Sequence, residues 1–98
     1  MTIDLLTIDM FNDKSGQAFV LERPDAPAIT LTLTEVTPLR NYATAPRAPF
    51  SLIFTAQGAD VLQQQMYELR HATLGLKWFF LVPIGKKDDT VSYQAIFN

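Results

Sequence analysis

Hydrophobic and polar residues alternate with a period of two along most of the chain, which is typical of half-buried β-strands. The clearest stretch is residues 28–37, where Ile29, Leu31 and Leu33 alternate with threonines. Four similar alternating stretches and one nearly continuous apolar run at 76–84, each bounded by turn residues, predict five more strands. Their approximate ranges are 17–22, 50–56, 64–71, 76–84 and 90–97.

Two positions interrupt this alternation and predict irregular strands. Val36 is apolar on the parity opposite to that of Ile29, so we expect a bulge or bend at Glu35 and Val36. Pro83 cannot donate to a ladder, so the strand at 76–84 should end or bulge there. Residues 72–75, Ala-Thr-Leu-Gly, are predicted to form the hairpin loop that precedes this strand.

Helical spacing occurs only near the start of the chain. Leu6, Met10 and Phe11 fall at i, i+4 and i+5, and Ser15 with Gly16 forms a stop signal, so we expect one short helix at about residues 7–15. The fold class is therefore mainly β. We predict one domain, residues 1–98, built as a six-stranded antiparallel small roll or partly open barrel in a meander-like order, its helix plugging an end or covering a face.

Composition excludes several classes of protein. With 48% hydrophobic and 18% charged residues over 98 positions, the chain is expected to fold as a single domain. A net charge of −2 without a basic stripe argues against a nucleic-acid partner. The acidic start and the absence of a long apolar run predict no signal peptide, no transmembrane segment and no membrane insertion. We expect synthesis in the cytoplasm and leave later export open.

The residues that could carry chemistry are few. There is no cysteine, and His71 is the only histidine, so Ser51, His71 and Asp60 form the one hydrolase candidate. Ser51 lies within a strand and His71 at a hairpin end, which favours a solvated turn histidine. Residues 86–89, Lys-Lys-Asp-Asp, favour a solvated hairpin tip over a cation site. We predict no enzyme activity, catalytic residue, cofactor or metal.

Two candidate protein-binding surfaces remain. The first is Arg40, Tyr42 and Arg47 in a proline-stiffened connection, because Tyr and Arg are frequent interface anchors. The alternative there is structural, with Arg47 paired to an acid and Tyr42 capping the core. The second is the strand at 76–84, which is apolar on both faces; we expect Phe79 and Leu81 on the uncovered face. The alternative is that barrel twist and the helix cover this face.

Several segments spread over nearly the whole chain resemble one family. They are Phe11–Gly16 with Phe19, Leu31–Leu33 with Val36, Arg47–Phe54, Tyr67–His71 with Leu74–Gly75, Phe80–Gly85, and the terminal Tyr93, Ala95, Phe97 and Asn98. The sequence is similar to an uncharacterised bacterial family of single domains of about this length. The resemblance implies a small β domain without an assigned activity or site, with some members encoded near phage-tail-like or tail-collar proteins.

Together these observations favour a non-enzymatic protein-interaction or assembly module. We expect its partner to be a protein. One route is self-association through a sheet edge or an apolar face. We expect its setting to be an accessory role in a phage-tail-like or surface structure. The alternative is a carrier of small apolar ligands, with a cavity lined by Trp78, Phe80, Tyr67 and Tyr93. A minor hydrolase is the least favoured hypothesis.

Overall fold

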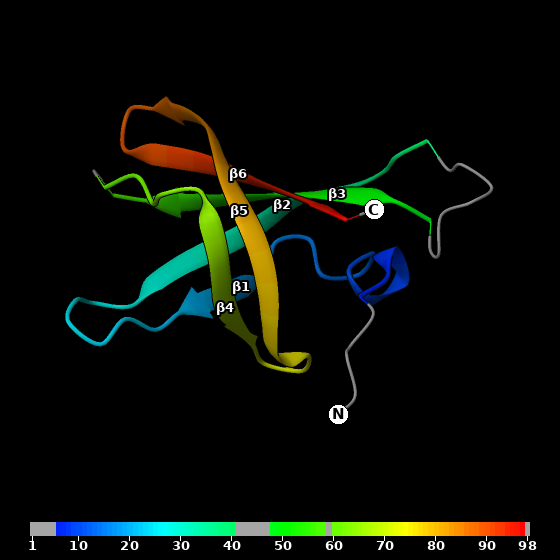
Figure 1. The fold of residues 1–98 in the computed structure, drawn as a ribbon, viewed down its shortest axis with the longest axis horizontal. Coiled ribbons are helices and arrows are strands. Elements are labelled where there is room, and N and C mark those ends of the chain that lie inside the picture. The colour runs from blue at the N-terminus through cyan, green and yellow to red at the C-terminus, as the bar shows by residue number, and fades with distance from the viewer. Residues whose placement is uncertain (1–5, 41–47, 59, 98) are drawn as a thin grey trace.

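The computed structural model describes residues 6–40, 48–58 and 60–97. Its six strands close into an antiparallel barrel in the order β1-β2-β3-β6-β5-β4 (Figure 1). The strands are β1 Ala18–Leu21, β2 Ile29–Pro38, β3 Phe50–Gln57, β4 Gln65–His71, β5 Gly75–Lys87 and β6 Thr90–Phe97. The predicted mainly β, six-stranded barrel is confirmed. The predicted ranges agree closely, except that β5 extends past Pro83 to Lys87.

The strand order is not a simple meander. β1, β2 and β3 form one antiparallel set, and β4, β5 and β6 form another. The two sets join along β3 and β6 through eight residue pairs, and they meet again at β1 and β4 through the single pair of Val20 with Arg70. The connection after β3 therefore crosses the barrel to reach β4.

Both predicted strand irregularities are present. The register of β2 against β3 shifts between Leu33 and Glu35, and the register of β5 against β6 shifts between Pro83 and Gly85. β5 pairs with β4 through its first half, up to Leu81, and with β6 through its second half, from Val82 onward. A bulge bends a strand, which allows β5 to pass from one neighbour to the other.

The N-terminal segment is less helical than its spacing predicted. It contains one 3₁₀ turn, Ile8–Met10, in place of a helix over residues 7–15. The backbone N–H of Gly16 donates to the carbonyl of Leu33 at 2.7 Å, and the N–H of Leu33 donates to the carbonyl of Gln17 at 3.1 Å. These bonds join residues 16 and 17 to β2, so the chain cannot be helical up to the end of the predicted range. Within the described residues, no helix has the length and apolar character needed to span a bilayer.

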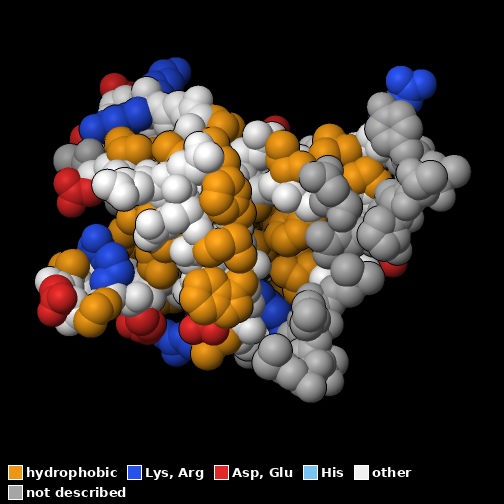
Figure 2. Space-filling model, viewed as in Figure 1, with side chains coloured by type: hydrophobic (Ala, Val, Ile, Leu, Met, Phe, Trp, Pro, Cys, Tyr) orange, Lys and Arg blue, Asp and Glu red, His pale blue; other side chains and the backbone are white. Residues whose placement is uncertain are grey.

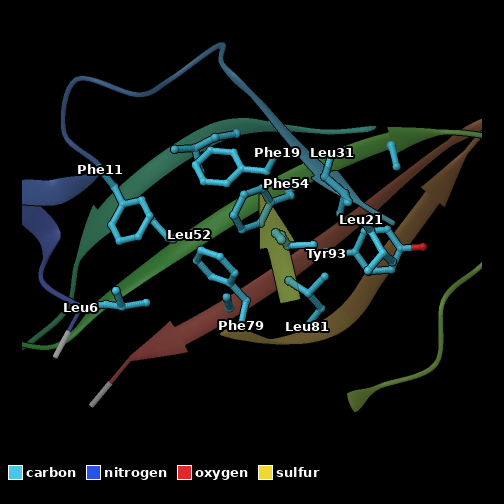
Figure 3. Close-up of a cluster of buried hydrophobic side chains, with 14 of the residues drawn as sticks. Leu6, Phe11, Phe19, Leu21, Leu31, Leu52, Phe54, Phe79, Leu81 and Tyr93 are labelled. Atoms are coloured by element: carbon cyan, nitrogen blue, oxygen red, sulfur yellow. The ribbon is translucent and has the colours of Figure 1, made fainter. Parts of the chain in front are cut away.

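The barrel interior is filled by aromatic rings. Phe11, which follows the 3₁₀ turn, plugs one end, and its ring lies 5.9 Å from the rings of Phe50 and Phe79 between centroids. Figure 3 shows Phe11, Phe19, Phe54 and Phe79 pointing toward one another between the strands. The fully buried large side chains are Tyr93, Phe11, Phe19, Phe50, Phe54, Phe79, Leu31, Leu33, Leu52, Leu69, Leu81 and Val91. Phe79 makes edge-on contacts with Phe11, Phe19 and Phe54, whereas Phe97 stacks on Phe11 and Phe50.

Candidate functional site

His71 ends β4 and turns its ring into the barrel. The ring packs on Phe19 with a centroid distance of 4.6 Å, and the residue is buried, so the expectation of a solvated turn histidine is wrong. Its Nδ1 accepts the backbone N–H groups of Thr73 at 3.1 Å and Leu74 at 3.2 Å. Nδ1 is thus unprotonated, and Nε2 carries the proton and donates to Oε1 of Gln17 at 2.6 Å. The ring holds the β4–β5 turn in place.

The same contacts make the fold sensitive to mild acid. Burial, and then the nearby charge of Lys14, lower the pKa of His71 below its ordinary value of 6.5. As pH falls through 6.5, His71 binds a proton in the unfolded chain but not in the folded chain. The free energy of unfolding therefore decreases until pH reaches the lowered pKa of His71 in the folded chain. We expect the urea midpoint to be lower at pH 5.5 than at pH 7.5 and to change much less in His71→Gln.

His71 is the chain's only histidine, so no other imidazole titrates in this interval. A wild-type midpoint that does not change with pH, or a variant that keeps the full dependence, would show that burial of this ring does not control acid stability.

The hydrolase arrangement is not assembled. Ser51 lies between the core residues Phe50 and Leu52 of β3, so its side chain is on the outer face of the barrel wall, and its Oγ accepts Nε2–H of Gln94 at 3.0 Å. His71 is on the inner side, and both of its ring nitrogens are occupied by other groups. No nitrogen is left to accept a proton from Ser51, as a nucleophile and base require.

Of the Arg40, Tyr42 and Arg47 surface, only Arg40 can be placed. It is exposed just after β2. Tyr42 and Arg47 lie outside the described residues, so this surface stays a prediction.

Phe79 and Leu81 do not lie on an uncovered face. Both have no exposed surface, and Phe79 is at the centre of the aromatic core, so the prediction that they bind a partner is wrong. The reason is that the pairing of β4 with β5 differs by one residue from the pairing predicted from the sequence. The sequence assigns residues 72–75 to the hairpin loop, but the structure pairs His71 with Gly75, which leaves a three-residue loop. A one-residue shift moves every side chain of a strand to the other face.

The outer face of β5 is the exposed apolar one. Leu76, Trp78, Phe80 and Ile84, here called the outer row, are each between 43% and 56% exposed, and Met66 of β4 lies beside Phe80 with 49% exposed. Figure 2 shows a column of hydrophobic side chains running along β5. The sequence does contain a signal for this arrangement. Glu68 is a charged residue and is therefore expected on the outer side of β4. With a three-residue loop, Glu68 pairs with Trp78, so Trp78 is on the outer side of β5 as well.

The four aromatic residues proposed to line a carrier cavity do not converge. Tyr67 pairs with Phe79 and Tyr93 is buried, so both belong to the inner side, whereas Trp78 and Phe80 are on the outer side. The hydroxyl of Tyr93 accepts the backbone N–H of Leu62 at 2.9 Å and is used within the chain. The interior is therefore not available as an aromatic-lined cavity of this composition.

Two surface hollows offer little recognisable chemistry. One, of about 410 Å³, lies beside β2 and β3; its Arg23 donates twice to the carbonyl of Pro27, at 2.7 and 2.9 Å. The other, of about 540 Å³, lies along the β1–β4 seam and reaches Leu76. Within the parts of the chain that the structure describes, no three His, Asp or Glu side chains gather as a metal site would require.

A family model matches nearly the whole chain. The family model described as "Domain of unknown function (DUF6916)" matches residues 6–97. No curated protein and no solved structure matches the chain.

Proposed function

Since the chain belongs to the DUF6916 family of domains of unknown function, we propose a function from its geometry: a non-enzymatic module that binds a protein or assembles with one. The observation that carries the proposal is the outer row. Large aromatic and aliphatic side chains are enriched at the centres of protein interfaces. Here they occupy consecutive outward positions of one strand, Leu76, Trp78 and Phe80, and continue to Ile84.

Energetics support the same proposal. A fully buried Phe or Leu side chain gains roughly 1.5 to 3 kcal/mol over an exposed one, so each half-exposed member of the row forgoes about 1 kcal/mol. A partner that covers Trp78 and its neighbours recovers this free energy. The row is also held rigidly by ladder pairs to β4 and β6, which keeps the entropic cost of docking low.

We further propose an accessory role in a phage-tail-like or surface structure as the setting of this module. What supports this setting is the resemblance described in the sequence analysis, which implies that some members of the family are encoded near such proteins. A rigid domain with one apolar strand face suits a structural joint between larger components.

Site-specific photo-crosslinking tests the proposed function. A photoreactive phenylalanine analogue at Phe80 is expected to give covalent protein adducts in cells that naturally express the chain, because this side chain lies within the proposed interface. The matched control carries the same analogue at Thr30, which is exposed on β2, three strands away around the ring. Absence of adducts from position 80, or equal yields from both positions, would contradict binding through the outer row.

A further inference from the structure

The exposed apolar surface on β5 matches the size of one ordinary interface. The outer row and Met66 each leave about half of their surface exposed, which is roughly 100 Å² per residue and about 500 Å² together. A standard interface covers about 800 Å² on each partner, of which about 60% is apolar. The row therefore supplies the apolar share of a single standard interface, with a polar rim still to be provided.

The polar rim is provided by two opposite charges on β4. Glu68 lies beside Trp78, and Arg70 lies beside Leu76, so both charged side chains flank the row on the outer side of the barrel. Arg70 also donates to Glu22 of its own chain at 2.7 Å, but a guanidinium has five N–H groups and can serve two carboxylates. A basic rim would suit a membrane surface, whereas this rim carries both signs.

The spacing of these charges makes the surface complementary to itself. Because Glu68 and Arg70 are two residues apart on one strand, a two-fold axis between them places Glu68 of each copy opposite Arg70 of the other. The same axis places Trp78 against Leu76 of the second copy, since these residues pair with Glu68 and Arg70 across the ladder. A two-fold interface thus satisfies the two charged positions and the apolar contact of Trp78 with Leu76 together, while Phe80 and Ile84 lie farther along β5 from the axis.

We infer that the partner of the outer row is a second copy of this chain, bound face to face through β5 and β4 about a two-fold axis. The inference rests on the proposed function and names its partner. The two copies bury Trp78 at the centre, with Glu68 and Arg70 forming reciprocal ion pairs at the rim.

Light scattering over about a hundredfold range of concentration tests the inference. The mass of the purified chain is expected to rise from the 11.0 kDa of one copy toward twice that value. Trp78→Glu should raise the dissociation constant about tenfold or more, because it removes the central contact and buries a charge. Thr30→Glu, on the far side of the ring, should leave the dissociation constant unchanged.

A charge exchange provides the sharper test, because it leaves the apolar row intact. Glu68→Arg alone should weaken the dimer, since it sets arginines against each other across the axis. Glu68→Arg combined with Arg70→Glu should restore it when Glu22→Arg is added, because this third change keeps the ion pair that residue 70 makes within its own chain. Far-UV circular dichroism verifies that each variant is folded.

A wild type that stays monomeric over the whole range, or a triple variant as weak as Glu68→Arg, would overturn the inference. If the wild type is monomeric and Phe80 still crosslinks to a different protein, the self-association fails while the proposed function stands. If position 80 also gives no adducts, both fail.

Discussion

Phe79→Glu is expected to leave the domain unfolded at 25 °C, with loss of the β signal in far-UV circular dichroism. Phe79 has no exposed surface, and its ring lies 5.6 to 6.0 Å from four other phenylalanine rings. Removing the ring alone costs about 3 to 5 kcal/mol, and an unpaired carboxylate buried in its place costs several more. Together these costs approach or exceed the roughly 5 to 15 kcal/mol that stabilises a typical domain.

The neighbouring residue is the matched control. Trp78→Glu introduces the same charge one position away, but on the outer face, so we expect a folded domain with a cooperative urea transition. If Phe79→Glu were folded and Trp78→Glu unfolded, the two faces of β5 would be the reverse of those described, and the outer row would not exist.

Phe11→Ala is expected to lower the free energy of unfolding by about 3 to 5 kcal/mol. Phe11 comes from the segment before β1, yet it is fully buried and lies within 5.9 to 6.4 Å of the rings of Phe19, Phe50, Phe79 and Phe97. Alanine removes these ring contacts and leaves a cavity at the end of the barrel. Urea titration followed by circular dichroism gives the difference.

Asn12→Ala provides the comparison for Phe11. Asn12 is the next residue and is exposed, and changes at such positions shift stability by about 0.5 kcal/mol or less. A loss under about 1 kcal/mol in Phe11→Ala would mean that the N-terminal segment is not part of the core.

The strands were predictable because their signal is local. The alternation of Ile29, Leu31 and Leu33 with threonines needs no knowledge of neighbours, and the irregularities near Val36 and Pro83 follow from parity and from a missing N–H group. The helix prediction failed for a non-local reason. The spacing of Met10 and Phe11 allows a helix, but the bonds of residues 16 and 17 to β2 end it early.

The strand order and the faces of β5 depend on long-range pairing and could not be read from periodicity. Nothing in the β3 pattern shows that its neighbour is β6 and not β4. The sequence predicted an excess of apolar surface on β5. Which side of β5 carries this surface depends on whether Gly75 belongs to the hairpin loop or to the ladder, and the structure places Gly75 in the ladder. For the same reason, the buried state of His71 was not foreseen, since Phe19 and Gln17 reach it from distant parts of the sequence.

The single ladder pair between β1 and β4 makes this barrel behave as a sheet closed by a clasp. On either side of Val20 and Arg70, the seam is held by side chains, with His71 bonded to Gln17 and Arg70 bonded to Glu22. Local opening costs least where few backbone bonds must break, so we expect hydrogen exchange to be faster at this seam than along the eight pairs of β3 with β6. Nδ1 of His71 accepts two turn amides beside this clasp, so the loss of stability in mild acid acts next to the seam of the barrel that has the fewest backbone bonds.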